Sequence, residues 1–347
     1  MSFLPRKNKY VPPFGSKAAR ICLIGEAPGA VEVQKGMPFC GPAGSVLNDC
    51  LSAAQISRRD CYITNTIKEK PDDLRDFWKV RKKGTNEYHE WTEQGEAQLE
   101  QLLHELEQVE ANVFVTIGRV PSSALLGLLK ITEYRGYVYR ACLPSGRQIK
   151  VIPTIHPASV LRGGKWSWKH YIAHDLLKAK RLSKSPEIGW TERKLVTDLS
   201  FSETRQYLRE LRGKSPLSFD IEVSNWEVSC LSFSVDPLEA ISINLYRAGN
   251  GQPRWSEEEE LTLWQDIALV LEDKSTEKVA QNGIFDVQFL ANKMGILPKG
   301  KILDTMIAHS LMYPDFEKGL GFLASIHTEN QWYWKSMVSF KNPKKEA

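Results

Sequence analysis

Four short segments in the first half of the chain carry the side chains that a site for a nucleic-acid base would need. They are Gly25-Glu26-Ala27-Pro28-Gly29, Pro38-Phe39-Cys40-Gly41, Thr64-Asn65 and His156-Pro157-Ala158-Ser159. Together they supply backbone N–H groups, an aromatic plane, a bidentate amide and an imidazole. A pyrimidine flipped out of a DNA strand could stack on the phenyl ring, pair its Watson–Crick edge with the amide, and place beside the imidazole the carbonyl that gains charge as the glycosidic bond breaks.

Each of these residues also has a plainer interpretation when it is taken alone. A histidine before a proline is typical of a loop or a helix cap, an asparagine at a strand end is typical of a turn, and a phenylalanine is typical of a core. Only the joint occurrence of His156, Asn65 and Phe39 in separate loops favours a base-binding pocket.

A second group of residues could bind divalent metal ions. Asp220 and Glu222 lie two residues apart in a predicted strand, so their carboxylates face the same side. Such carboxylates repel each other unless a cation lies between them, and two hard divalent ions do so in phosphoryl-transfer nucleases. Asp286 supplies a third acid at the predicted start of a helix. For the first pair alone, an exposed strand edge is the competing interpretation.

The elements that position the first group alternate between strands and helices. We predict strands at 19–24, 61–67, 113–117 and 148–153, and helices at 44–54, 93–109 and 169–182. This alternation predicts an α/β domain with a mainly parallel sheet. Loops that follow parallel strands meet at one edge of such a sheet, where ligands bind. We therefore expect the four segments to converge.

A polar segment with proline and glycine, 183–193, separates two blocks that each have their own periodic elements, and we interpret it as a linker. Beyond it we predict helices at 203–211 and 257–271, a meander of strands at 217–221, 230–235 and 240–244, and a short strand at 278–280. The predicted organisation is an N-terminal tail (1–18), a first domain (19–182), the linker, and a second domain (194–347).

Charge is distributed unevenly between the two halves of this 347-residue chain. Residues 1–190 hold 28 Lys and Arg against 19 Asp and Glu, whereas residues 191–347 hold 18 against 23. A basic first half suits a polyanionic partner such as DNA, because neutralised phosphates release counterions. No apolar run is long enough for a membrane span and no secretory signal is evident, so we expect a cytoplasmic protein without a membrane role.

The ordered motifs GEAPG, G-x-P-F-x-G-x-A-G, I-T-N-x-I-K and HPASVLR, over roughly residues 19 to 180, resemble family 4 of the uracil-DNA glycosylases. In that family the first loop shapes the site and holds the attacking water, the Phe stacks on uracil, the Asn reads it, and the His stabilises the uracil anion. The resemblance implies uracil binding by Gly25, Glu26, Ala27, Phe39, Asn65 and His156. It implies catalysis by Glu26 and His156 with Glu32 as a second acidic candidate, and insertion of Leu161 and Arg162 into the duplex.

The chain departs from family 4 in its cysteines. Members usually hold an iron–sulfur cluster on four cysteines that begin with an N-terminal C-x-x-C, and none of the six cysteines here forms such a pair. After the Asn motif, where the family often has a cysteine, the chain reads Lys68-Glu69-Lys70-Pro71. We therefore expect no iron–sulfur cluster. Because the cluster is structural in the family, the pocket and its fold remain expected.

The DIE strand, the N-x-x-F-D segment and Leu303-Asp304-Thr305-Met306 resemble the proofreading 3′–5′ exonuclease domain of family A DNA polymerases, of the DnaQ-like class. The resemblance implies that Asp220, Glu222 and Asp286 bind Mg²⁺ or Mn²⁺, and it assigns Asp304 to packing. The family also needs a Tyr-x-x-x-Asp motif, which is not found after Trp334. Either a larger replicase supplies it, on a continuing or separate polypeptide, or the exonuclease has degenerated.

The expected fold is thus a three-layer α/β/α uracil-DNA-glycosylase-like domain followed by a ribonuclease H-like (DnaQ) exonuclease domain. This order resembles the N-terminal part of some bacteriophage DNA polymerases, which implies a polymerase partner or continuation in a host cytoplasm. The leading hypothesis is excision of uracil from DNA with an attached exonuclease. One alternative is a non-catalytic uracil sensor or DNA-binding module that docks on a polymerase. Another makes the exonuclease the sole enzyme.

Overall fold

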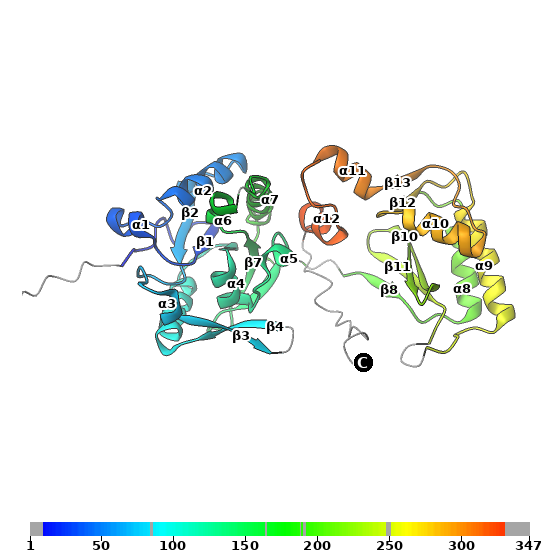
Figure 1. Ribbon diagram of the computed structural model, residues 1–347, viewed down its shortest axis with the longest axis horizontal. Helices are drawn as coiled ribbons and strands as arrows, with labels where there is room; N and C mark the ends of the chain where they lie inside the picture. The colour runs from blue at the N-terminus through cyan, green and yellow to red at the C-terminus, as the bar shows by residue number, and fades with distance from the viewer. Residues whose placement is uncertain are drawn as a thin grey trace, which may run out of the picture. The chain divides into compact units, whose positions relative to one another are not determined.

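Two compact units make up the chain (Figure 1). The computed structural model describes residues 10–83, 86–163, 165–187, 189, 192–247 and 251–329. The first unit contains the described residues up to 189 together with 321–329, and the second contains 192–320. The first half of the predicted tail and the sequence after Trp334, where the final exonuclease motif was sought, lie outside the described residues.

A five-stranded sheet forms the centre of the first unit. Its strands are β1 (Ile21–Gly25), β2 (Cys61–Asn65), β5 (Val113–Ile117), β6 (Tyr139–Cys142) and β7 (Gln148–Thr154), in the order β2-β1-β5-β7-β6. All neighbouring pairs are parallel except the pair of β6 and β7. β1, β2 and β5 are buried along their whole length, as strands covered on both faces must be. The predicted parallel sheet is therefore confirmed.

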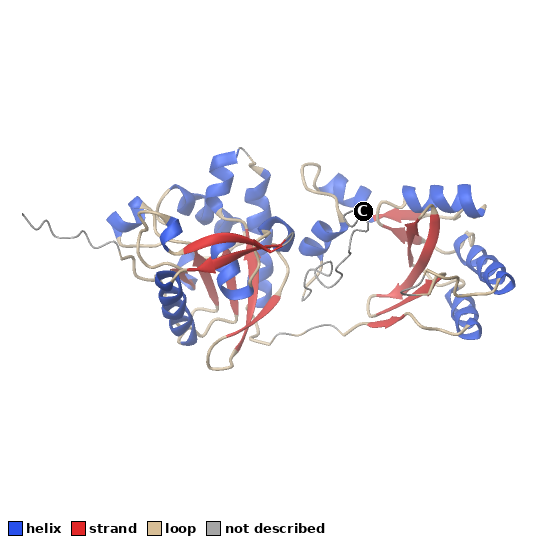
Figure 2. Cartoon of the chain, turned by 60° about the horizontal axis from the view of Figure 1, so that its bottom comes forward, coloured by secondary structure: helices blue, strands red, loops and turns tan. Residues whose placement is uncertain are grey.

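Helices cover both faces of this sheet (Figure 2). On one face, Leu102 and Leu106 of α3 (Glu93–Glu107) share a core with strand residues such as Phe114, and α4 (Arg119–Leu126) adds to the same layer. On the other face α7 (Ser167–Leu182) packs on β5 and β7, with α2 (Pro42–Ala53) beside it. The unit is completed by α1 (Ala30–Lys35), α5 (Ile131–Tyr134), α6 (Pro157–Gly163) and two short 3₁₀ turns.

The sequence between β2 and α3, which we interpreted only as polar, forms an antiparallel ribbon of β3 (Trp78–Lys83) and β4 (Asn86–Trp91). Phe77 and Trp78 pack with Ile67 and Val120 in a small core at its base. Most of the ribbon is exposed, including Val80 and Tyr88, so no buried apolar face marks it in the sequence.

The second unit is built on a six-stranded mixed sheet in the order β13-β12-β9-β10-β11-β8. The predicted meander is confirmed as β9 (Leu217–Ser224), β10 (Glu227–Asp236) and β11 (Glu239–Asn244). β8 (Lys194–Val196), β12 (Lys278–Ala280) and β13 (Ile302–Asp304) pair in parallel with their neighbours. Helices α8 (Phe201–Leu211) and α9 (Glu257–Leu271) begin with capping boxes and bury their apolar faces in the core of this unit.

Short helices follow in the last part of the described chain. They are α10 (Ile284–Phe289), which continues into one π-helical turn (Leu290–Met294), α11 (Thr305–Met312) and α12 (Leu320–His327). Residues 321–329 belong to the first unit, although they follow the second in sequence. Among the helices that the structure describes, none combines the length and apolarity needed to cross a bilayer.

Candidate functional site

The carboxyl ends of β1 and β2 bring the first candidate residues together. Gly25 ends β1 directly opposite Asn65, which ends β2. A Cβ atom on Gly25 would lie 2.3 Å from the Asn65 amide oxygen and 2.6 Å from the Phe39 ring, so only glycine fits here. The first, second and third predicted segments therefore meet at one point, as expected for parallel strands.

Phe39 and His156 form the aromatic part of the site. Their ring centroids are 5.9 Å apart with a 34° angle between the planes. Phe39 adopts a positive φ of 49°, a left-handed backbone conformation that is uncommon for a bulky residue. Such strain persists only where the surrounding structure imposes it, and it clusters at ligand sites. The ring is 5% exposed and Asn65 is equally buried.

The imidazole of His156 accepts a hydrogen bond from the backbone two residues further along the chain. The Ala158 N–H donates to Nδ1 at 3.1 Å, so Nδ1 is an acceptor and the proton of a neutral ring lies on Nε2. Burial, aided by the positive charge of Arg162, lowers the pKa of His156 to about 4. At neutral pH this residue is therefore an uncharged hydrogen-bond donor at Nε2. The predicted loop after His156 is in fact helical from Pro157.

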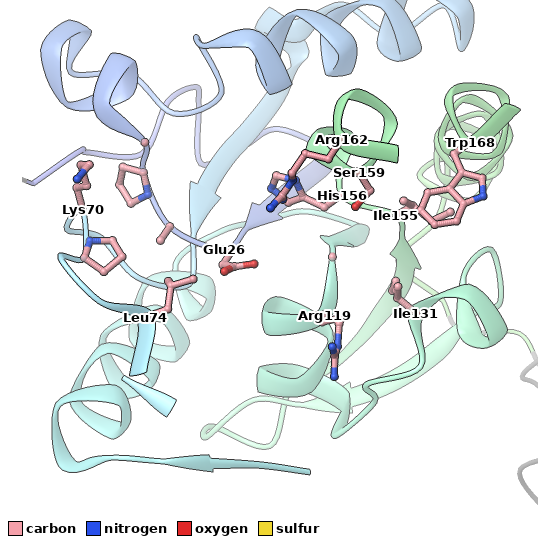
Figure 3. A pocket seen from close by; sticks show the side chains of 15 residues that line it. Glu26, Lys70, Leu74, Arg119, Ile131, Ile155, His156, Ser159, Arg162 and Trp168 are labelled. Carbon is pink, nitrogen blue, oxygen red and sulfur yellow. The ribbon is translucent and has the colours of Figure 1, made fainter. Parts of the chain in front are cut away.

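An open cavity of about 500 Å³ adjoins these residues (Figure 3). Its lining includes the predicted residues Glu26, Ala27, His156 and Arg162, and also Arg119 and Trp168, which sequence reasoning missed. Burial raises the pKa of Glu26, and the positive charges of Arg162 and Arg119 oppose that shift. The cavity thus places a carboxyl of raised basicity near a neutral imidazole, with two guanidinium groups at its wall.

Other predicted residues lie beside the cavity instead of lining it. Phe39 and Asn65 are packed behind it against Gly25. The Glu32 carboxylate, on α1, accepts the Gly41 N–H at 3.1 Å, and so it ties two loops together. Leu161, on α6, has 46% of its surface exposed, as a side chain that enters a duplex would need.

Lys68 is a further residue of this site that the sequence alone did not reveal. Its side chain is 1% exposed, and its ammonium donates to Thr64 Oγ1 at 2.5 Å and to the Asn65 carbonyl at 2.8 Å. It also forms an ion pair with Glu105 of α3 at 2.7 Å. Lys68 therefore holds the end of β2, where Asn65 lies. No local pattern distinguishes a buried lysine of this kind from an exposed one.

We expect Lys68→Met to lower the free energy of unfolding by about 3 to 5 kcal/mol, because Glu105 would remain buried without a counter-charge. Chemical denaturation of the full chain measures this change. The double variant Lys68→Met/Glu105→Leu should recover most of the loss, and the exposed control Lys79→Met should stay within about 0.5 kcal/mol of the unmodified chain. A single variant as stable as that control would contradict the role assigned to the pair.

The second candidate site lies on β9. Asp220 and Glu222 alternate along the strand with the buried Phe219 and Ile221, so their carboxylates share the face opposite the apolar core. Asp286 of α10 is 4% exposed and accepts the Ile221 N–H at 2.9 Å. Burial, then the negative charges of Asp286 and Glu222, raise the pKa of Asp220 to about 6. The three predicted acids therefore interact with one another.

These acids match divalent metals in the chemistry of their oxygen donors. Nevertheless, within the described parts of the chain no three His, Cys, Asp or Glu side chains are gathered closely enough to hold one ion. Asp304 has a different role, because its carboxylate accepts the Gly283 N–H at 2.8 Å and the Met306 N–H at 2.8 Å. It caps α11 and fixes the loop before Asp286.

Comparison with known proteins identifies the first unit. Residues 12–175 match the sequence model of the uracil DNA glycosylase superfamily. The type-4 uracil-DNA glycosylase of Archaeoglobus fulgidus is 35% identical over 160 residues, which cover 45% of this chain and 73% of that enzyme. The chain belongs to the uracil-DNA glycosylase superfamily. The corresponding type-4 enzyme of Thermotoga maritima is 31% identical, over 49% of this chain and 81% of its own length.

The second unit has a different relationship. Residues 200–329 match the sequence model of the 3′–5′ exonuclease family, so a glycosylase region and an exonuclease region are fused in one chain. A DNA polymerase of Bacillus phage SP01 is 26% identical over 333 residues, which cover 86% of this chain and 33% of that polymerase. The chain thus spans about a third of the length of this relative. Both recognised families and their order agree with the sequence-based prediction.

Proposed function

We propose that the glycosylase unit removes uracil from DNA by hydrolysing the N-glycosidic bond. The observation that carries this proposal is the neutral imidazole of His156, whose Nδ1 is occupied by the Ala158 N–H while the Phe39 ring lies beside it. The N–H of a neutral imidazole can stabilise the negative charge that develops on a leaving base by donating a hydrogen bond, without transferring its proton. Membership in the superfamily supports the same chemistry.

The proposed reaction begins when deoxyuridine rotates out of the strand and its base enters the site. Asn65 reads the Watson–Crick edge and Phe39 stacks on the ring. The bond between C1′ and N1 then breaks, and its electron pair passes to the uracil ring, where the Nε2–H of His156 stabilises the negative carbonyl oxygen. Water adds to C1′ and loses a proton, for which Glu26 is the proposed acceptor because burial raises its pKa.

The DNA strand is the proposed occupant of the cavity mouth. Arg119 and Arg162 line it, Lys70 adds a third cation, and Trp168 adds an aromatic surface (Figure 3). Cations neutralise phosphates and aromatic rings stack on bases, which together suit a single strand. We propose Leu161, exposed on α6 next to Arg162, as the residue that fills the space left by the flipped base.

A single-stranded oligonucleotide with one uracil tests this function. We expect incubation with the full chain, followed by hot alkali, to break the strand at the uracil, because alkali cleaves the abasic site. The matched oligonucleotide with thymine should remain intact. If a control glycosylase breaks the uracil strand and this chain does not, the enzymatic proposal is contradicted. Tighter binding to the uracil strand without cleavage would instead identify a uracil sensor.

We also propose metal-dependent 3′–5′ exonuclease activity for the second unit. Asp220, Glu222 and Asp286 would hold Mg²⁺ or Mn²⁺, an assignment supported by the pKa of Asp220, which burial and then the negative charges of Asp286 and Glu222 raise to about 6. A divalent ion bound there would polarise the phosphate and lower the pKa of a bound water. The similarity to a phage DNA polymerase further supports a polymerase, covalently attached or separate, as the partner.

A further inference from the structure

The segment 321–329 is unusual because family similarity and packing assign it to different units. It is the end of the region that matches the exonuclease family, yet it packs in the glycosylase unit. Leu323, Ser325 and Ile326 are buried, and the Phe322 ring lies 4.7 Å from the Tyr171 ring of α7. Tyr137 donates its hydroxyl to the Gly321 carbonyl at 2.5 Å. The contact is therefore both apolar and polar.

A buried cluster of charges in the glycosylase unit depends on this segment. Arg135 and Lys178 are 1% and 2% exposed, and Asp175 is the carboxylate between them. Arg135 pairs with both Asp175 oxygens and donates to Ser325 Oγ at 3.1 Å. Lys178 donates to the Ser325 carbonyl and, at 2.6 Å, to the Gly136 carbonyl.

The charge balance of this cluster explains why a helix end is needed. Arg135 and Lys178 face one carboxylate, and burial lowers the pKa of Lys178 to about 7. A buried basic group without a partner is strongly unfavourable. The Ser325 carbonyl is in the last turn of α12, where free carbonyls carry partial negative charge and commonly accept from lysine. Gly136 permits this approach, since its φ is +74° and a Cβ would lie 2.6 Å from Asp175 and 3.0 Å from the Ser325 carbonyl.

The same cluster supports the strand that carries His156. Asp175 accepts the Thr154 hydroxyl at 2.6 Å, and Thr154 is the last residue of β7. The Gly136 N–H donates to the Pro153 carbonyl at 2.9 Å, one residue earlier on the same strand. Two residues beyond Thr154 the chain reaches His156. A set of buried hydrogen bonds therefore runs from α12 to the end of β7, two residues before His156.

We propose that segment 321–329 is a positioning element for uracil excision, which acts through Arg135, Asp175 and Thr154 to set the His156 imidazole. This inference rests on the proposed glycosylase function and deepens it, because the last part of the exonuclease-family region becomes a component of the glycosylase site. A displacement of about 1 Å at a reacting group can cost about 100-fold in rate. The loss of a few contacts between α12 and the charge cluster should therefore lower kcat measurably.

The test compares two double variants of the full chain. Phe322→Ala/Ser325→Ala removes the aromatic contact and the hydroxyl partner of Arg135. The control Ser310→Ala/Leu311→Ala removes a serine hydroxyl and an exposed apolar side chain from α11. We expect the α12 variant to lower kcat for uracil release about 10-fold or more, with KM changed about twofold at most. NMR titration should show the pKa of His156 rising from about 4 toward its ordinary value. The α11 variant should match the unmodified chain in both measurements.

A milder variant covers the case in which the α12 variant does not fold. Arg135→Lys keeps the charge but loses the paired contacts to Asp175 and Ser325, and it should shift kcat and the His156 titration in the same directions. Unchanged kcat and an unchanged titration in a folded variant would overturn the inference. If the unmodified chain releases no uracil, the proposed function fails, and the His156 titration alone then decides the positioning role.

Discussion

Replacing His156 by alanine should lower kcat for uracil release by about 10² to 10³-fold, the usual cost of losing one donor to a developing oxyanion. The Ala158 N–H donates to Nδ1 of the imidazole, which leaves the Nε2–H as the hydrogen-bond donor to the base. KM should change much less, because the lost interaction strengthens only as the glycosidic bond breaks. Single-turnover release of uracil from a labelled oligonucleotide measures this effect.

The pH dependence separates this role from general acid catalysis. Because the pKa of His156 is about 4, the ring stays neutral from pH 6 to 8, and no histidine-dependent change in kcat should occur over that range. The unfolded chain binds the proton near pH 6.5, so His156 contributes stability above that value and loses it as the pH falls toward 4. His156→Gln should therefore lose less stability than the unmodified chain between pH 6.5 and 4. A kcat that rises on protonation of His156 would contradict the neutral-donor role.

Sequence reasoning succeeded where periodicity and buried runs are strong. β1, β2 and β5 are continuous apolar segments followed by glycine or turn residues, and their parallel pairing follows from the helices between them. The helices predicted at 203–211 and 257–271 are also present, as α8 and α9, and each begins with a capping box. The β3–β4 ribbon was missed because its stability comes from a few aromatic residues at one end. Local patterns cannot report such long-range packing.

In the candidate site, too, some features could be predicted from the sequence and others could not. The loops that carry Gly25, Asn65 and His156 could be placed at one sheet edge because alternating strands and helices predict a mainly parallel sheet. Lys68 and Arg135 could not, because burial of a charged side chain depends on partners far away in the sequence, Glu105 and Asp175. Similarly, the exonuclease resemblance gave no sign that residues 321–329 pack in the other unit. Tertiary contacts determine which charged side chains are buried and where residues 321–329 pack, and the spacing of residues in the sequence does not predict such contacts.

Replacing Asp220 by asparagine should abolish metal-dependent trimming of a 3′ end, a loss of about 100-fold or more, while making the metal-free chain more stable at neutral pH. The two effects have one cause. Burial, and then the negative charges of Asp286 and Glu222, raise the pKa of Asp220 to about 6. The group therefore favours the folded state below about pH 4 and loses that contribution as the pH rises to 6. Asparagine removes the repulsion and a metal ligand together.

Thermal unfolding in EDTA and in Mg²⁺, with Mn²⁺ binding followed by EPR, tests both effects. The unmodified chain should gain stability from Mg²⁺ because the ion binds only the folded site. Asp220→Asn should have a higher Tm than the unmodified chain in EDTA, and Mg²⁺ should raise that Tm only slightly. Glu258→Gln, which removes one exposed charge from α9, should behave like the unmodified chain. If Asp220→Asn still trims a 3′ end and still binds Mn²⁺, these carboxylates are not the metal site, and the raised pKa of Asp220 reflects only crowding of like charges on β9.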